Sequence, residues 1–445
     1  MTTTRWRLGA AIVLACALAV PGAGARQSED VHSDNIEQLA QVPIRIDEDV
    51  FAQGSDMAFR DDLLVAGSYE GMALFRILPR APYVRQISFF DCPGSQGDVS
   101  LVGDHVLISI DSGGSNTGRT PRCNNTDDSV GAEGIRIVDI SNPRAPRQVR
   151  FVETPCGSHT HTILPDGAKT YVYVESYPLG APTASCSPAS HRKVSIVEMP
   201  TADPAKAKLA GSLDVSPEIG CHDVTVVPQR DLAVVACIAE SQVWDIADPS
   251  KPVILSRIYN PSIQIHHSAG LTWDGKYMAI GDEFAGSVTG TCPGERPWTV
   301  GAMWFYDVTD PSTPIPAGYY NIPRRALPGS QEEAGYLACT THNFNVLPMK
   351  HEGHYVASIG YRNAGISVID FSDPSNATEI AHYLQMNDGM IPDVWSAYWY
   401  NGRIYASDNG ALRGISVYEL EGTGPKDVHY FDGTMNPQVQ IPDFR

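Results

Sequence analysis

The chain has 445 residues, of which 51 are Asp or Glu and 32 are Lys or Arg, so its formal net charge at pH 7 is −19. An acidic surface of this kind favours solubility and repels nucleic acid and anionic membranes. We therefore expect no nucleic acid among the partners.

Residues 1–25 have the pattern of a secretory signal peptide. Arg5 and Arg7 precede an apolar segment from Leu8 to Val20, and Ala23-Gly24-Ala25 supplies small residues for cleavage. The apolar segment is too short to span a bilayer comfortably, although a retained membrane anchor is the alternative. Since no later stretch is a transmembrane candidate, we expect a secreted, periplasmic or cell-surface protein with no integral membrane segment after cleavage.

The next residues, 26–41, are polar and predict a flexible lead. Val42 to Ile46 then predicts a strand that closes a ring, and Asp427 to Phe431 is its expected partner near the other end of the chain. Pro43 is compatible with the start of such a strand. Residues 433–445 are expected to form a C-terminal tail.

The phrase GIRIVDISNPRAPRQV, residues 134–149, returns in variants along the chain. Closer copies begin at Gln242, Met303 and Gly365, and looser ones at Gly71, Val194 and Gly414. Each copy alternates apolar and other residues, breaks at a Pro-containing turn and resumes with a second β-rich run, which predicts strand, turn, strand. Seven copies, spaced roughly 48 to 63 residues apart, predict an all-β fold over residues 42–432. The expected architecture is a seven-bladed β-propeller of four-stranded antiparallel blades, closed by pairing of N- and C-terminal strands.

A predicted hairpin stands before each copy of the phrase. Clear hairpins begin at His161, His222, His267 and His342, and weaker ones cover Met57–Ala66, Val99–Ile110 and Trp395–Ala406. Their turns carry Asp-Gly or polar pairs, as tight hairpins require. We expect the first strand of each hairpin to be innermost, so that the segments before it and after the second strand lie on one face.

Cysteine usage predicts disulfides. Nine cysteines include Cys16 in the signal segment, and the other eight are Cys92, Cys123, Cys156, Cys186, Cys221, Cys237, Cys292 and Cys339. An even number in an exported chain favours disulfides over a metal-thiolate site, because no CxxC pair occurs. All eight are expected on the one face.

One disulfide follows from hairpin geometry. Cys221 and Cys237 are equidistant from Gln229 at the turn, so an antiparallel hairpin places them opposite one another. By proximity we pair the others as Cys92–Cys123, Cys156–Cys186 and Cys292–Cys339, although eight cysteines allow many connectivities. The same face collects four long insertions: 112–133, 177–192, 284–301 and 321–341. Such a face is a candidate surface for a protein or glycan partner.

Four histidines occupy one register position. Counting back six residues from the residue that opens each turn (Pro165, Pro228, Trp273 and Pro348) reaches His159, His222, His267 and His342. Only 13 of 445 residues are His, so this alignment is poorly explained by chance. At the start of innermost strands the four imidazoles would converge on the mouth of the central channel, where three or four His ligands suit a catalytic metal. The structural alternative is that they line a wet channel.

Further candidates surround this predicted metal site. His161 follows His159 on the same side of its strand, and His266 precedes His267 with the opposite orientation. Acids recur where second strands return to the face, and Glu240 and Glu283 belong to hairpins that supply an aligned His. Such carboxylates could orient ligating imidazoles or act as a general base. The predicted catalytic residues are therefore His161, His266, Glu240 and Glu283.

The repeated phrase resembles that of the LVIVD-repeat proteins, a family of secreted or surface propellers, and this resemblance implies the fold but no particular activity. The hairpins SHTHTILPDG and IHHSAGLTWDGKYMAIGDE resemble those of the selenium-binding protein and methanethiol oxidase family, which implies copper-dependent thiol oxidation with roles for His159, His161, His266 and His267. Some propeller polysaccharide lyases are similar in using a His-bound metal.

Two functions of different classes follow. The first is a metal-dependent enzyme whose metal is copper, manganese, zinc or calcium: with copper we expect oxidation of a small thiol or other reduced substrate, and with the others a lyase or hydrolase for an acidic or sugar substrate. The second is a non-catalytic extracellular scaffold that binds a protein or glycan through its looped face.

Overall fold

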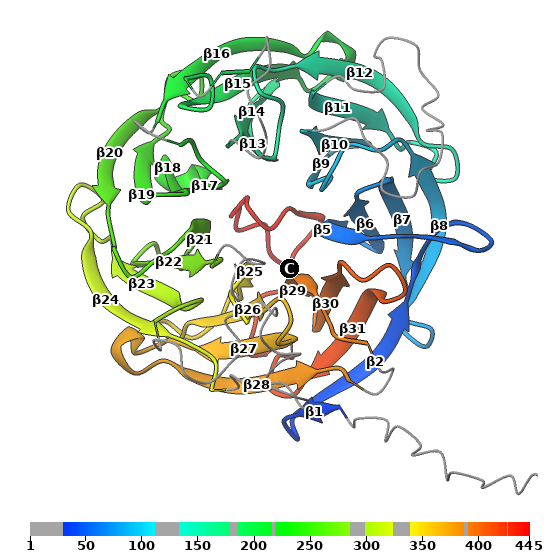
Figure 1. Ribbon diagram of the computed structural model, residues 1–445, viewed down its shortest axis with the longest axis vertical. Helices are drawn as coiled ribbons and strands as arrows, with labels where there is room; N and C mark the ends of the chain where they lie inside the picture. The colour runs from blue at the N-terminus through cyan, green and yellow to red at the C-terminus, as the bar shows by residue number, and fades with distance from the viewer. Residues whose placement is uncertain are drawn as a thin grey trace, which may run out of the picture.

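The computed structural model describes residues 30–111, 133–177, 186–187, 189–215, 219–284, 299–323, 339–386, 390–424 and 426–445. In this part of the chain the regular elements are β-strands and three 3-10 turns, η1 (Pro204–Lys206), η2 (Pro228–Arg230) and η3 (Pro374–Asn376). No helix there is long and apolar enough to cross a membrane. The fold is all-β, as predicted, and its sheets stand around a common centre (Figure 1).

Most of the sheets contain four consecutive antiparallel strands. The first consists of β5 (Gly54–Arg60), β6 (Leu63–Ser68), β7 (Gly71–Ile77) and β8 (Val84–Asp91), with β32 (Thr434–Met435) beside β5. The second sheet contains β9 (Val99–Val102), β10 (His105–Ile110), β11 (Gly134–Asp139) and β12 (Arg147–Glu153), and the third contains β13 (Thr160–Asp166), β14 (Lys169–Glu175), β15 (Lys193–Pro200) and β16 (Lys208–Asp214). The fourth contains β17 (Asp223–Val227), β18 (Leu232–Cys237), β19 (Glu240–Asp245) and β20 (Val253–Ile258), and the fifth contains β21 (His266–Leu271), β22 (Tyr277–Asp282), β23 (Met303–Asp307) and β24 (Ile315–Tyr320).

The remaining large sheet has nine strands in two halves. One half contains β25 (Asn343–Val346), β26 (Val356–Gly360), β27 (Ile366–Asp370), β28 (Thr378–Leu384) and β1 (Val31–His32), and the other contains β29 (Val394–Tyr400), β30 (Arg403–Asp408), β31 (Gly414–Leu420) and β2 (Ile36–Val42). A short parallel pairing of β25 with β29 joins the halves. β3 (Ile44–Asp47) and β4 (Val50–Ala52) form a separate two-stranded sheet.

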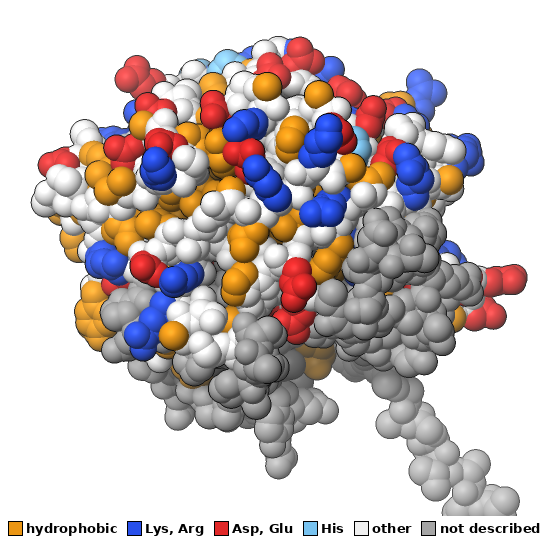
Figure 2. Space-filling view, turned by 90° about the horizontal axis from the view of Figure 1, so that it is seen from above, with side chains coloured by type: hydrophobic (Ala, Val, Ile, Leu, Met, Phe, Trp, Pro, Cys, Tyr) orange, Lys and Arg blue, Asp and Glu red, His pale blue; other side chains and the backbone are white. Residues whose placement is uncertain are grey.

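Burial follows the position of each strand in its sheet. All five residues of β17, DVTVV, are buried, whereas β20, VILSRI, alternates between exposed and less exposed residues. Inner strands are covered on both faces by neighbouring sheets and are therefore buried along their length, while an outermost strand presents one face to water. The expectation that the first strand of each hairpin is innermost is confirmed (Figure 1). On the outer surface, acidic and basic side chains are interspersed with hydrophobic ones (Figure 2).

The repeated phrase owes its Asp and Pro to two successive Asx turns. In four copies the Asp that ends the third strand accepts a hydrogen bond from the backbone N–H two residues later: Asp139, Asp245, Asp307 and Asp370. The Asn or Asp before the Pro repeats this bond: Asn142, Asp248, Asp310 and Asp373. Short acceptors at these positions hold the chain in a tight connection between the third and fourth strands.

The N-terminal expectations need correction. Ile36–Val42 is strand β2 and pairs with β31, so the flexible lead expected over 26–41 is wrong for residues 36–41. Of the segment expected to close the ring, Val42–Ile46, Val42 ends β2, whereas Ile44–Ile46 belong to β3, which pairs with β4. The sequence IEQLAQV conceals a strand because an outermost strand needs only one partly buried face and tolerates its glutamines.

The C-terminal tail expected over 433–445 is also wrong. Thr434–Met435 pairs with β5, and the segment then enters the centre of the ring (Figure 1). The Asn436 side chain bonds both backbone groups of Leu101, and the Gln440 side chain bonds both backbone groups of Leu271. Between them, the backbone on both sides of Val439 pairs with Val226. The segment therefore satisfies polar groups of three inner strands, an arrangement that local sequence patterns do not reveal.

Two predicted disulfides are confirmed. Cys221–Cys237 joins the ends of one hairpin with a Cα–Cα distance of 3.5 Å, and Cys156–Cys186 has a Cα–Cα distance of 4.7 Å. Cys92 and Cys339 are also disulfide-bonded. Their expected partners, Cys123 and Cys292, lie outside the described residues, as do the signal segment and most of the long insertions, so these expectations stay predictions.

Candidate metal centre

The structure brings the four aligned histidines together at the starts of four consecutive inner strands. The backbone N–H groups of His159, His222 and His342 each donate to the returning second strand over 2.8 Å, at Glu175, Ala236 and Gly360. His267 lies at a β-bulge between β21 and β22. The shared backbone position confirms the register that the sequence indicated.

The imidazoles form a continuous row in ring order. Ring centroids are 4.7 Å apart for His159 and His222, 3.7 Å for His222 and His267, and 4.2 Å for His267 and His342. All four residues are at most 4% exposed. Three ring contacts thus join four histidines from four different sheets into one row.

Their Nε2 atoms face common neighbours. His159 Nε2 lies 3.1 Å from His222 Nε2. The Glu283 carboxylate stands between the other two, with 3.3 Å from Oε2 to His267 Nε2 and 3.6 Å from Oε1 to His342 Nε2. Ligands held about 2.0–2.2 Å from one metal ion lie about 3–3.5 Å from one another. The two carboxylate contacts therefore have the dimensions of a coordination shell, and the ligand atoms of His267, Glu283 and His342 all lie within 4.8 Å of one another, so these three residues could hold an ion.

The outer two rings are oriented through their Nδ1 atoms. His159 Nδ1 lies 2.7 Å from Asp111 Oδ2, and His342 Nδ1 lies 2.6 Å from the backbone carbonyl oxygen of Trp395. Both acceptors require the proton on Nδ1, which leaves the Nε2 lone pair available to a ligand. A carboxylate or carbonyl behind a ligating imidazole is the usual way to fix its tautomer and raise its basicity.

The middle two rings have buried atoms that lack a protein partner. His222 Nδ1 and His267 Nδ1 are both buried and make no hydrogen bond with the protein. Burial lowers the pKa of His222, His267 and His342 well below the usual value, and neighbouring charged groups lower it further. Since these rings stay neutral at physiological pH, each retains a lone pair for coordination.

Charged and aromatic groups complete the surroundings. Burial raises the pKa of Glu283, while Arg362, whose Nη1 is 3.7 Å from Glu283 Oε1, opposes the shift. Tyr177 packs edge-on against His159 at 4.6 Å between centroids, and Trp395 lies 4.4 Å from the His342 ring. Tyr69, in contact with Trp395, has its pKa raised to about 12 by burial. Aromatic and charged side chains therefore flank both ends of the row.

Asp111 is one of the acids that follow a second strand on the face that carries the histidines, whereas Tyr177, Arg362 and Trp395 were not predicted. Tyr177 and Arg362 also follow the ends of second strands, β14 and β26, but the rule was applied to acids alone. Trp395 acts through a backbone carbonyl, for which the sequence has no signal.

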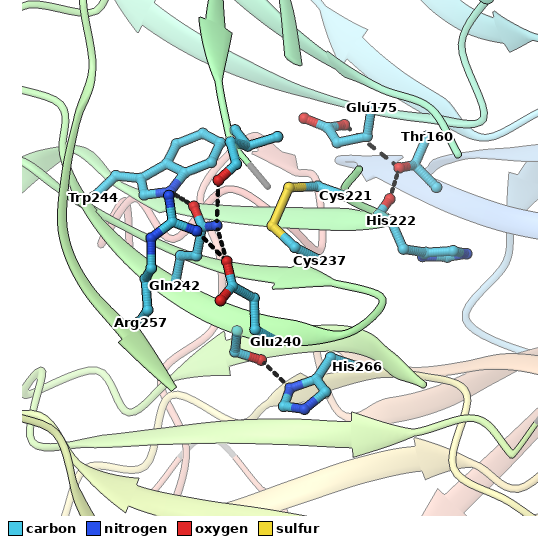
Figure 3. The surroundings of a disulfide bond; sticks show 12 residues. Thr160, Glu175, Cys221, His222, Cys237, Glu240, Gln242, Trp244, Arg257 and His266 are labelled. Atoms are coloured by element: carbon cyan, nitrogen blue, oxygen red, sulfur yellow. Dashed lines mark hydrogen bonds and ion pairs between the residues drawn. A yellow bond between two sulfur atoms is a disulfide. The ribbon is translucent and has the colours of Figure 1, made fainter. Parts of the chain in front are cut away.

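Two predicted catalytic residues do not join the row. Glu240 pairs with Arg257 and accepts from the Gln242 side chain, on the opposite side of the Cys221–Cys237 disulfide from the His222 ring (Figure 3). His266 Nδ1 contacts Ser241 Oγ at 2.7 Å, and burial lowers its pKa to about 4. Successive residues of a strand point to opposite faces, so His266, which precedes His267 on β21, points away from the row.

His161 lies one layer further along the same strand. Its Nδ1 is 2.8 Å from Ser109 Oγ and 3.1 Å from Asp98 Oδ2. Further buried carboxyl groups surround this layer, and burial raises the pKa of Asp56 and Asp223 well above the usual range. The predicted direct catalytic role of His161 therefore has no support in the contacts, and its surroundings are those of a buried polar layer beneath the histidine row.

A second group with metal-ligand spacing consists of Cys156, Cys186 and His191. The two cysteines form a disulfide, so they offer no thiolate to an ion. The histidine row with Glu283 is thus the better candidate for a metal centre.

The comparisons with known proteins give a family-model match to the repeats and similarities to solved structures. Residues 130–154 and 352–385 match the family model of the LVIVD repeat. No curated protein matches the sequence. Among solved structures, the chain is similar to the β-propeller domain of Cps50 (Swd1) from Myceliophteria thermophila, at 10% identity and a TM-score of 0.49, over 82% of this chain and 97% of that chain. It is also similar to the computationally designed Ika8 protein, at 9% identity and a TM-score of 0.45, over 86% of this chain and 100% of that chain.

The assignment of the fold rests on the sheets themselves and on the repeats. Four-stranded antiparallel sheets surround a common centre, and the Asx turns that the repeated phrase encodes connect their outer strands. The chain is a β-propeller protein that carries LVIVD repeats.

Proposed function

We propose that the chain is a secreted seven-bladed propeller enzyme with a metal ion bound at the mouth of its central channel. The blade count takes the two halves of the nine-stranded sheet as separate blades, and the pairing of β2 with β31 would close the ring. Disulfides in the described residues fit an oxidising compartment. The proposed ligands are His159, His222, His267 and His342, with Glu283 beside them.

The single observation that carries the proposal is the convergence of four buried imidazoles, two of which are held by acceptors on Nδ1. A row that served only as channel lining would not need Asp111 and the Trp395 carbonyl behind its outer rings. Imidazole nitrogens suit copper, zinc and manganese-type sites, whereas calcium takes oxygen ligands. Of the four expected metals, calcium therefore fits the donor set least.

When bound, such an ion supplies a Lewis acid or, in the case of copper, an electron acceptor. Within the protein, Glu283 has a raised pKa and stands 3.3 Å from His267 Nε2, so it is placed to take or return a proton. Tyr177 packs against the His159 ring, and Trp395 packs against the His342 ring. The substrate that we propose is a small molecule.

The reaction that we propose is oxidation of a small thiol by copper-loaded protein, with dioxygen as the oxidant. Two thiols lose two electrons and two protons, and dioxygen gains them as hydrogen peroxide. The test loads untagged protein separately with copper, zinc or manganese and measures oxygen uptake with small thiols and unsaturated product with uronate oligosaccharides. Thiol turnover confined to the copper form supports the proposal. Turnover of the oligosaccharide would replace it with a lyase, and a metal-bound protein inert toward both would contradict an enzymatic role.

Asp111→Asn is expected to weaken metal binding about 10- to 100-fold, the usual effect of removing an outer partner of a ligating histidine. The amide carries no charge and accepts less strongly from His159 Nδ1, so the ring loses basicity and orientation. A titration against a competing chelator measures the change. Asp104→Asn is the matched control, because that aspartate is exposed and forms a surface ion pair with Arg60 at 3.2 Å. Equal affinities in the two variants would exclude a role for Asp111.

A further inference from the structure

The Cys156–Cys186 disulfide has a histidine beside it. His191 Nε2 lies 3.0 Å from Cys186 Sγ, and its Nδ1 lies 3.2 Å from Ser176 Oγ. A ring nitrogen of His191 and both sulfur atoms lie within 4.8 Å of one another. Burial lowers the pKa of His191, so the ring is neutral near pH 7 and able to accept a proton.

This disulfide is more accessible than its counterpart in the next sheet. Cys186 is partly exposed, and Pro155 and Ser187 beside the bridge are exposed. A hollow of about 570 Å³ adjoins it, lined by Pro155, Ser190 and residues of β15 and β16. Cys221 and Cys237, by contrast, are both 0% exposed. One chain thus carries an accessible bridge with a neighbouring imidazole and a sealed bridge that serves as an internal reference.

We propose that Cys156–Cys186 is a thiol–disulfide exchange site for a small external thiol, with His191 as its proton carrier. The external sulfur attacks Cys186 Sγ, and the bond to Cys156 breaks with its electron pair staying on Cys156 Sγ. The new bond is a mixed disulfide between the external thiol and Cys186. His191 accepts the proton that the external thiol loses and returns it to the Cys156 thiolate. The products are one mixed disulfide and one Cys156 thiol, so atoms and electrons balance.

The chemistry of such an exchange favours this placement. Attack requires a thiolate, and a neutral imidazole beside the scissile bond generates one at the point of use. The departing thiolate leaves more easily when a protonated imidazole lies within reach. Both cysteines of the Cys221–Cys237 disulfide are 0% exposed, so an external thiol cannot reach either sulfur atom. The two disulfides therefore differ in their accessibility to a thiol and in having a histidine beside them.

The experiment incubates the folded, full-length exported protein with reduced glutathione and follows each cysteine by alkylation and peptide mass spectrometry. We expect glutathione to appear on Cys186, with Cys156 as the free thiol, at least about tenfold faster than any opening of Cys221–Cys237. Opening of both bridges at one rate, or of neither, would overturn the proposal. The measurement reads sulfur alone, so its outcome is independent of the metal centre.

Two variants test the role of His191. His191→Gln is expected to slow formation of the mixed disulfide about tenfold or more while leaving Cys221–Cys237 closed. His351→Gln, at an exposed histidine, is the matched control and should exchange at the rate of the unaltered protein. If His191→Gln fails to fold, Ser176→Ala keeps the imidazole and removes its Nδ1 contact, and a smaller slowing is expected. An unchanged exchange rate in whichever variant folds would show that His191 carries no proton in the exchange.

Discussion

His267→Ala is expected to weaken metal binding at least about 100-fold, the largest effect of any single substitution in the row. His267 contacts both neighbouring rings and also Glu283, so its loss removes one ligand and disturbs two others. The chelator titration that serves for Asp111→Asn measures this change as well. Because the side chain is 1% exposed, its removal leaves a cavity, and the free energy of unfolding should fall by about 2–4 kcal/mol.

His351→Ala is the matched control, because it removes a histidine that does not belong to the row. His351 is exposed, outside the row and on the chain between β25 and β26. This variant should keep the metal affinity and stability of the unaltered chain. Retention of full metal affinity by folded His267→Ala protein would remove His267 from the ligand set and contradict the four-histidine centre.

Deletion of residues 434–445 is expected to lower the free energy of unfolding by about 5 kcal/mol or more. The segment makes hydrogen bonds to Leu101, Val226 and Leu271, and Gln438 donates to the buried Asp56 over 3.0 Å. Each bond contributes about 1 kcal/mol net, and the buried groups left without partners cost more. Urea unfolding of the full and shortened chains measures the difference.

The matched control for the deletion is Ile441→Ser. Ile441 belongs to the same segment but is 38% exposed, so its replacement should change stability by less than about 0.5 kcal/mol. The histidines stand at the starts of inner strands, whereas Leu101 and Leu271 stand near or at strand ends, so folded shortened protein should still bind metal. A shortened chain with unchanged urea midpoint would contradict the structural role of the segment.

The sequence revealed the blades because their outer turns depend on particular residues. Asp139 and Asn142 are needed as acceptors at fixed positions, and the same need recurs at Asp245 and Asp248. Such local hydrogen bonds leave a repeating pattern that can be read without the structure. Burial strengthens the pattern, because inner strands such as β17 are buried throughout and rich in valine.

The two ends of the chain could not be read in this way. Strand β2 is polar enough to resemble a linker, and residues 434–445 owe their order to long-range bonds with inner strands. A side-chain amide that bonds a distant backbone, as Gln440 does, follows no local propensity. These segments are ordered by tertiary contacts alone.

The histidine row could be predicted because its four members occupy the same position in four hairpins. The residues that contact the row could not all be predicted. Glu240 and Glu283 both lie near the return of a second strand, yet only Glu283 reaches the imidazoles. The difference is which way each side chain points after its strand ends, and no sequence pattern fixes that direction. Trp395 contributes a carbonyl, which any residue could supply.

Metal analysis of the exported, untagged chain tests the central claim most directly. Protein produced with several metal supplements should carry about one equivalent of copper, zinc or manganese per chain, held by the histidine row. A protein that binds less than about a tenth of an equivalent under every supplement would contradict the metal centre and leave the row as a channel lining.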